Sequence, residues 1–162
     1  MKYRSAFLTR ILSAALILIV LTGIHSCRKK LPEITDNALY VANEYDGTIT
    51  VIDATSREVI TTIDLMDHSL ISEKEVMFMP HNVQVAPDGK TVWVTGNSMK
   101  TDKEDQLIVI DPVKNKIIKR IKVGLDQHLA HVVLDDGSRF AYATSNDNSH
   151  VIKIDAKEFT EV

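Results

Sequence analysis

The residues best suited to chemistry in this chain are histidines and methionines. His81 and His128 each precede a predicted β-strand, and His131 lies within one. Imidazole nitrogen and thioether sulfur together form a ligand set suited to copper, so His81 and His131 are candidate metal ligands. The candidate ligand-binding residues are Met79, His81, Asn82, His128 and His131.

Three aspartates resemble a carboxylate set, but Asp53, Asp111 and Asp155 each follow an isoleucine where a predicted strand enters a turn. Asp side chains accept hydrogen bonds from turn amides, so we interpret all three as turn residues. The sequence has no nucleotide-binding glycine string, serine nucleophile elbow or paired-cysteine metal motif. We therefore predict no catalytic residue, and we expect a role that is not enzymatic and uses no cofactor.

The elements that position these side chains are short runs rich in β-branched residues, separated by turn residues. From Ala38 onward, no run has apolar residues at helical spacing. We predict strands at 39–42, 48–52 and 59–63, then at 83–86, 91–95, 107–110 and 117–123, and finally at 130–134, 140–144 and 151–154. The sequence therefore predicts an all-β chain.

The three sets of strands are copies of one unit. The pair Ile-Asp recurs in each set, and the turn Pro87-Asp88-Gly89-Lys90 recurs as Asp135-Asp136-Gly137-Ser138. Successive Ile-Asp pairs lie about 40 to 60 residues apart, close to the length of a four-stranded propeller blade. Alternating polar residues in 119–123 predict the solvent-exposed face of an outer edge strand, where lysines discourage edge pairing.

The segments Tyr40-Val41-Ala42-Asn43 and Val83-Gln84-Val85-Ala86-Pro87-Asp88-Gly89-Lys90, with Val92-Trp93-Val94-Thr95, resemble the YVTN family of β-propeller repeats. The resemblance extends from Ala38 to the last residue. It implies blades of four antiparallel strands, each with its first strand along a central channel. We expect about two and a half blades, at 38–65, 81–124 and 129–162, with the first lacking its innermost strand and the third its outermost. Because propellers have at least about four blades, we expect a fragment of a longer protein.

The resemblance also predicts that the connections of the blades alternate between two faces. The turns on one face are short, whereas the other face takes the longer connections 66–80, 96–106 and 124–128. The histidines and methionines after residue 37 lie on or near this second face. Since variable loops on a rigid scaffold carry function, we expect the second face to be the working face.

The N-terminal residues have the three-part layout of an export signal. Residues 1–10 are basic, residues 11–24 carry no charge, and Ser26 precedes Cys27, the only cysteine. Residues 21–27 resemble the lipobox of bacterial lipoproteins, from which His25 departs. The resemblance implies a signal peptide at 1–26, lipidation of Cys27 and a tether at 27–37, hence an exported protein anchored to a membrane in the bacterial periplasm or at the outer membrane.

The distribution of charge argues against nucleic acid as a partner. The chain has 19 basic and 22 acidic residues. Six of the basic residues lie before Leu31, where no acidic residue lies: Lys2, Arg4, Arg10, Arg28, Lys29 and Lys30. The remainder is acidic and offers no electrostatic footprint for a phosphate backbone. We expect the lipid to contact a membrane and the working face to contact a protein, peptide or glycan.

These observations favour a binding or interaction module displayed on the cell envelope. The alternative is a periplasmic redox propeller that binds haem or copper, because the repeats also resemble the propellers of haem d1 nitrite reductases and nitrous-oxide reductases. A third reading is a lactonase-type propeller, which would need acidic calcium ligands in its channel. No such ligand set is recognisable in these blades.

Overall fold

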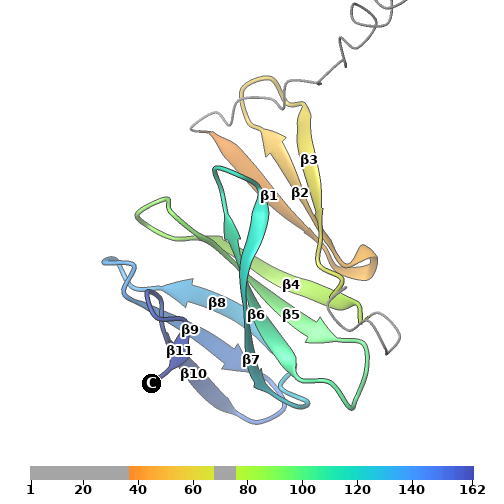
Figure 1. Ribbon diagram of the computed structural model, residues 1–162, viewed down its shortest axis with the longest axis vertical. Helices are drawn as coiled ribbons and strands as arrows, with labels where there is room; N and C mark the ends of the chain where they lie inside the picture. The colour runs from red at the N-terminus through yellow and green to blue at the C-terminus, as the bar shows by residue number, and fades with distance from the viewer. Residues whose placement is uncertain (1–36, 68–75) are drawn as a thin grey trace, which may run out of the picture. The chain divides into compact units, whose positions relative to one another are not determined.

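The computed structural model describes residues 37–67 and 76–162, all of which belong to one compact unit at 32–162. The predicted signal peptide, Cys27, most of the tether and His68 lie outside the described residues. The described residues form three antiparallel sheets, in each of which the strands are neighbours in chain order. Figure 1 shows the second sheet between the first and the third.

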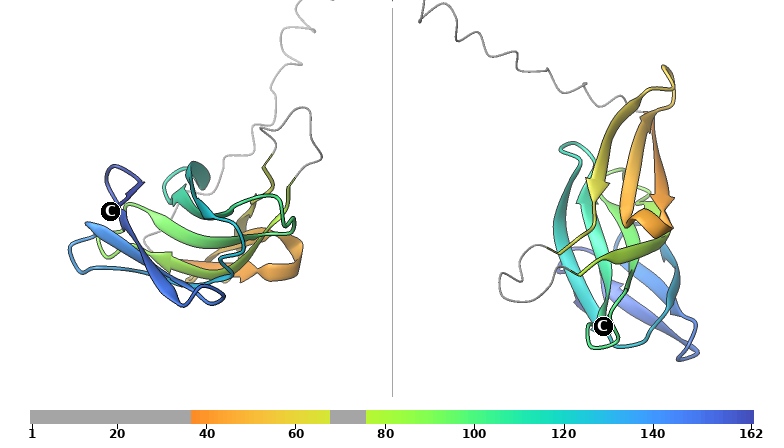
Figure 2. Two further views of the ribbon diagram at one scale, coloured as in Figure 1. Left: turned by 90° about the horizontal axis from the view of Figure 1, so that it is seen from below. Right: turned by 90° about the vertical axis from the view of Figure 1, so that its right-hand side faces the viewer.

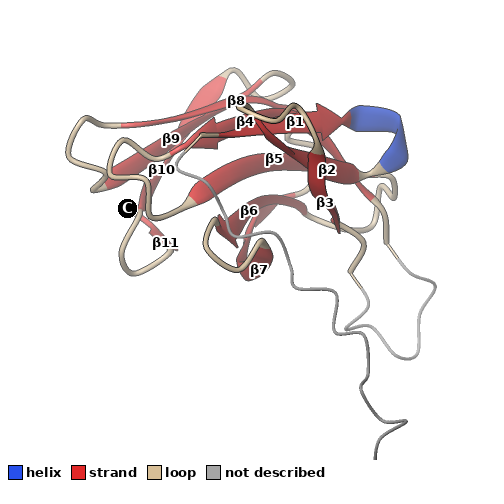
Figure 3. Ribbon diagram, turned by 90° about the horizontal axis from the view of Figure 1, so that it is seen from above, coloured by secondary structure: helices blue, strands red, loops and turns tan. Residues whose placement is uncertain are grey.

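The first sheet contains β1 (Ala38–Asn43), β2 (Thr48–Asp53) and β3 (Val59–Asp64), with the short 3-10 turn η1 (Glu44–Asp46) between β1 and β2. The second contains β4 (Phe78–Val85), β5 (Val92–Ser98), β6 (Asp105–Asp111) and β7 (Lys116–Gly124). The third contains β8 (Leu129–Leu134), β9 (Phe140–Ser145), β10 (His150–Asp155) and β11 (Thr160–Glu161). In the described part of the chain η1 is the only helical element, as Figure 3 shows in blue, so the predicted all-β class is confirmed.

Every predicted strand is present, but two details of the prediction are wrong. The third sheet does have an outermost strand, because Thr160 and Glu161 pair with Asp155 and Ile154. The connections predicted at 66–80 and 96–106 are shorter than expected, since strand pairing continues to Phe78, Ser98 and Asp105. His81 consequently lies inside β4, where the pairing with β5 shifts register between residues 80 and 83.

The three turn aspartates confirm that the sheets are copies of one unit. Oδ1 of Asp53 accepts hydrogen bonds from the amides two and three residues later, at 2.7 and 3.0 Å. Asp111 makes the same pair at 2.8 and 3.0 Å, and Asp155 at 2.9 and 2.9 Å. The amides of Glu158 and Lys157 hold the pKa of Asp155 below its ordinary value, because they stabilise the charged carboxylate. The interpretation of these residues as turn residues is therefore confirmed.

The turns β4–β5 and β8–β9 correct the sequence alignment by one residue. The amide of Ala86 donates a hydrogen bond to the carbonyl oxygen of Thr91 at 2.9 Å. In the same way, the amide of Asp135 donates to the carbonyl oxygen of Phe140 at 3.0 Å. Within these loops Gly89, with φ +70°, and Ser138, with φ +52°, hold the same left-handed position. Gly137, which the shared Asp-Gly pair aligns with Gly89, lies one residue earlier. A serine thus adopts the conformation that glycine adopts most easily.

The hydrophobic core has two layers, one on each face of the middle sheet. Figure 2 shows the strands of the three sheets from two further sides. Side chains alternate along a strand, so Ile108 and Ile110 pack toward the first sheet while Leu107 and Val109 pack toward the third. All four are fully buried. Trp93 packs in the layer between the second and third sheets and is also fully buried. Each layer therefore needs two adjacent sheets.

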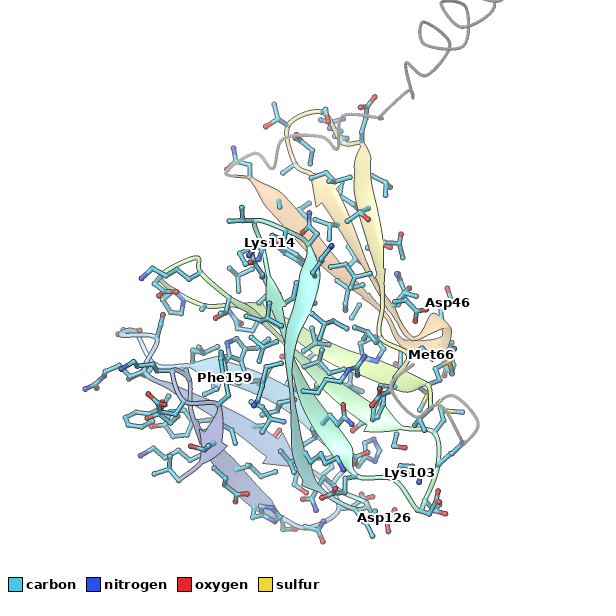
Figure 4. All side chains as sticks on the ribbon, in the orientation of Figure 1. Asp46, Met66, Lys103, Lys114, Asp126 and Phe159 are labelled. Carbon is cyan, nitrogen blue, oxygen red and sulfur yellow. The ribbon has the colours of Figure 1, made fainter. Side chains whose placement is uncertain are left out.

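The connections lie alternately at two opposite edges of the sheets. Figure 4 shows Asp46, Met66, Lys103 and Asp126 along one edge, which we call the loop face. Lys114 lies at the opposite edge, among the tight turns. The loop face takes the connections β1–β2, β3–β4, β5–β6, β7–β8 and β9–β10.

Arg120 contradicts the prediction that residues 119–123 simply form a solvent-exposed edge. Its guanidinium donates hydrogen bonds from Nη2 to the carbonyl oxygens of Leu65 and Met66, at 2.9 and 3.1 Å. It also lies 5.5 Å from the ring centroid of Phe78. Burial lowers the pKa of Arg120, and the carboxylates of Asp67 and Asp64 oppose that shift. Arg120 thus binds the start of the β3–β4 connection to the middle sheet.

Gly47 and Gly89 provide a matched pair of substitutions, because both have a left-handed backbone. A Cβ on Gly89 would meet no atom within 4 Å, so Gly89→Ala should cost only the backbone strain, about 1 kcal/mol. A Cβ on Gly47 would lie 2.7 Å from Cγ of Met77 and 3.3 Å from the carbonyl oxygen of Phe78. Gly47→Ala should therefore reduce the free energy of unfolding further, as measured by urea denaturation. Equal losses would show that the packing around Gly47 has no energetic effect.

Replacing Arg120 should weaken the attachment of the β3–β4 connection. Arg120→Met retains an apolar stem but leaves the carbonyls of Leu65 and Met66 without their charged donor, so unfolding should become easier by about 2 kcal/mol. Lys119→Met is the control, since Lys119 is exposed on the same strand. Urea denaturation of both variants checks the prediction. A loss no greater than that of the control would contradict it.

Candidate ligand-binding face

Three imidazoles come together at the inner strands of the second and third sheets. The ring of His81 lies 6.5 Å from that of His128 and 6.2 Å from that of His131, measured between centroids. Nδ1 of His81 is 3.2 Å from the carbonyl oxygen of Ala130. Because a carbonyl only accepts hydrogen bonds, this nitrogen carries the proton in neutral His81, and Nε2 is the acceptor. We call these three residues the histidine group.

The backbone of His128 is held in place by a hydrogen bond, whereas its side chain is exposed. Its φ is +48°, and its amide donates to Oδ2 of Asp105 at 3.0 Å. The side chain remains 53% exposed, with Nδ1 3.6 Å from Oδ1 of Asp147. The backbone is therefore fixed while the imidazole faces solvent.

The residue that fixes this part of the loop face is not among the predicted site residues. Asp105 is 4% exposed, and its carboxylate accepts three backbone hydrogen bonds: from Ser98 at 2.7 Å, Gln127 at 2.8 Å and His128 at 3.0 Å. Three amide donors compensate a buried carboxylate for lost water. Asp105 thus joins the β5–β6 connection to the β7–β8 connection. No local motif distinguishes it from a surface aspartate.

Asn97 joins the same two sheets and is also not among the predicted site residues. It is 9% exposed, and its amide group makes both hydrogen bonds to the backbone of Leu129. Its Nδ2 donates to the carbonyl oxygen at 3.1 Å, and its Oδ1 accepts from the amide at 2.7 Å. Asn97 and Asp105 therefore fix the backbone on either side of His128.

Asn82, a predicted ligand-binding residue, is engaged within the fold. Its Oδ1 accepts a hydrogen bond from the amide of Val132 in the third sheet at 3.0 Å. Its own amide donates to Oγ1 of Thr95 at 2.8 Å. The side chain of Asn82 therefore joins the inner strands of two neighbouring sheets.

A pocket of about 230 Å³ opens on the loop face. Two of the predicted residues, Met79 and His128, line it, whereas His81, Asn82 and His131 do not. The other lining residues come from strands of the second sheet and from connections of all three sheets: Glu44, Asn97, Ser98, Met99, Lys100, Thr101, Lys103, Asp105, Asp126 and Asp147. Thioether, imidazole, ammonium, hydroxyl and carboxylate groups thus line one cavity.

Residues 37–67 and 76–162 contain no group of three or more His, Cys, Asp or Glu side chains that could hold a metal ion. Within the histidine group, Nδ1 of His81 is occupied by the carbonyl of Ala130. No helix among the described residues is long and apolar enough to cross a membrane.

No known protein family matches the sequence, and no curated protein matches it. Several solved structures are similar in fold. Hydrazine synthase of Kuenenia stuttgartiensis is 20% identical with a TM-score of 0.60, and the match covers 78% of this chain and 31% of that chain. Dihydro-heme d1 dehydrogenase NirN is 18% identical with a TM-score of 0.57, covering 77% and 24%. The periplasmic gluconolactonase PpgL of Pseudomonas aeruginosa is 18% identical with a TM-score of 0.53, covering 75% and 34%.

These matches concern the fold alone, because all three identities are low and the three proteins differ in function. The chain spans about a third or less of the length of each similar structure. The matched structures are β-propellers. The repeated sheets of this chain, packed face to face in chain order, are therefore part of a β-propeller.

Proposed function

We propose that this chain is part of an exported β-propeller lipoprotein that binds a protein, peptide or glycan through its loop face. The observation that carries the proposal is the pocket on that face, which is lined by strands of the second sheet and by connections of all three sheets. A site built from several blades has a fixed spatial arrangement only when the blades are packed together. Such clefts between rigid elements are where proteins usually bind ligands.

The walls of the pocket support a binding role because buried hydrogen bonds hold them. Asp105 and Asn97 fix the backbone around His128, so little ordering remains to be paid for when a ligand binds. Polar side chains also line the pocket, among them the exposed Thr101 and the half-buried Lys103. Donors and acceptors on a fixed frame suit a peptide or a glycan, both of which are rich in hydrogen-bonding groups.

A photo-crosslinking side chain can distinguish the two faces. Thr101 lines the pocket, whereas Val113 is 75% exposed in the β6–β7 turn at the opposite edge. With a photoreactive residue at position 101, the full-length protein in intact cells should form covalent adducts of defined mass. The same residue at position 113 is the matched control and should form none. Adducts at 113 alone, or equal adducts at both positions, would contradict the role of the loop face.

The proposed export and lipid anchor rest on the first 27 residues, where a basic segment and an uncharged segment precede Cys27. Each acyl methylene inserted into a membrane contributes about 0.8 kcal/mol, so more than one acyl chain gives stable anchoring. The binding face would then be displayed at a membrane surface.

Lipidation can be tested by metabolic labelling with an alkyne fatty acid. The wild-type protein should be labelled and recovered with the membrane fraction, because its cysteine carries the acyl chains. Cys27→Ser should be unlabelled. Equal labelling of the two proteins, measured by in-gel fluorescence, would contradict the anchor.

The second candidate is a redox propeller that binds copper or haem. The observation in its favour is the convergence of His81, His128 and His131 on one region. Against it, residues 37–67 and 76–162 contain no group of three or more His, Cys, Asp or Glu side chains that could hold a metal ion. Titration of the full-length protein with cuprous ion, and separately with haem, tests it directly. If His81→Ala combined with His131→Ala binds either as the wild type does, this candidate fails while the loop-face proposal stands.

A further inference from the structure

The two edges of the sheets differ in how their charged side chains are paired. We call the edge opposite the loop face the tight-turn edge. Four basic side chains there each form an ion pair with a carboxylate of the same turn, at 3.0 to 3.6 Å: Lys90 with Asp88, Lys114 with Asp111, Arg139 with Asp135, and Lys157 with Glu158. Charges at the tight-turn edge therefore compensate one another within single turns.

The loop face carries carboxylates that are not compensated in this way. Glu44, Asp126 and Asp147 are exposed, line the pocket and come from the β1–β2, β7–β8 and β9–β10 connections. None of these three connections contains Lys or Arg. Among the described residues, Glu44 and Asp126 form no ion pair. Asp147 lies 3.6 Å from the imidazole of His128. Figure 4 shows Asp126 at this edge of the sheets.

The lysines of the pocket differ from these carboxylates in exposure and pairing. Lys100 and Lys103 line the pocket from the β5–β6 connection, and both are half-buried. The ammonium of Lys103 lies 3.6 Å from the carboxylate of Asp102, and both lysines have interaction partners within the chain. Apart from the imidazole of His128, the exposed ionisable side chains of the pocket are therefore its three carboxylates.

Apolar side chains accompany these carboxylates. Met79 and Met99 line the pocket, and Met99 is 53% exposed. Tyr45 and Leu125 each adjoin a lining carboxylate in the chain and are 86% and 48% exposed. Aromatic side chains and methionine are enriched where proteins bind one another, and a thioether adapts to side chains of different shape. Carboxylates beside apolar groups suit a basic side chain, which has a hydrocarbon stem and a charged end.

We propose that the ligand of the loop-face pocket is a polypeptide segment that places a lysine or arginine side chain against the carboxylates of Glu44, Asp126 and Asp147. This inference rests on the proposed function and decides between its polypeptide and glycan ligands. Hydrogen bonds between charged groups are about twice as strong as those between neutral groups. A neutral glycan would gain nothing from the negative charge, and an anionic glycan would be repelled by it.

Selection from a phage library of random dodecapeptides tests the charge of the ligand. The bait is the full-length wild-type protein, and neutral chitotetraose is titrated against the same protein in parallel. Selected peptides should be enriched in Lys or Arg and depleted in Asp and Glu, because the carboxylates attract cations and repel anions. A selection that yields no peptide, or peptides without this enrichment, would overturn the inference. Binding of chitotetraose alone would assign the pocket to a glycan instead.

A pair of charge-removing variants locates the contact. Glu44→Gln combined with Asp126→Asn should weaken binding of a selected peptide about fivefold or more, measured by fluorescence anisotropy. Glu58→Gln combined with Asp136→Asn is the matched control and should bind as the wild type does, since both residues are exposed at the tight-turn edge. Wild-type affinity in the pocket variant, or an equal loss in the control, would contradict the proposed contact.

The peptide itself completes the test. Replacing its basic residue by norleucine should remove the difference between the wild type and the pocket variant, because the interacting pair is then already broken. A difference that persists with the norleucine peptide would show that the carboxylates do not contact the basic side chain. If the pocket variant still forms adducts from position 101 as the wild type does, the loop face binds a ligand that is not basic. If the wild type forms no adducts there and selects no peptide, the proposed function fails as well.

Discussion

The structure depends on the need to cover apolar side chains on both faces of the middle sheet. A strand alternates its side chains between two faces, and residues 107–110 are apolar without interruption. If only one face of this sheet were covered, only half of these side chains would be buried. Packing a sheet on each side buries all four completely, and the two core layers follow from this single requirement. Each sheet therefore depends on its neighbours more than on its own hydrogen bonds.

The same stacking creates the loop face. Because each sheet is a meander, its connections alternate between two edges, and stacking brings the equivalent edges of successive sheets together. At one edge the aspartate turns are closed by their own residues, and the amide of Asp88 also donates to Oγ of Ser138 in the corresponding turn of the third sheet. At the loop face, Asp105 and Asn97 bond to backbone groups at the start of the third sheet. The pocket forms at this second edge.

Polar side chains at the boundaries between sheets mainly form hydrogen bonds that join one sheet to the next. Asn82 and Asn97 each bond to the backbone of the third sheet, and Arg120 bonds to the connection that follows the first. Buried polar groups of this kind make each boundary specific, because a hydrophobic layer alone permits sliding between sheets.

The sequence by itself determined ten of the eleven strands in the described residues, their order and the aspartate turns. These features depend on alternation and on contacts between residues close in the chain, as the bond from Asp53 to an amide two residues later illustrates. Only the tertiary structure decided that Arg120 donates hydrogen bonds to the β3–β4 connection and that Asp105 is buried. It also decided that Ser138 rather than Gly137 is equivalent to Gly89, and which candidate side chains line the pocket. The partners of Arg120 and Asp105 lie on other strands, and only the packing of one sheet on the next brings them within hydrogen-bonding distance.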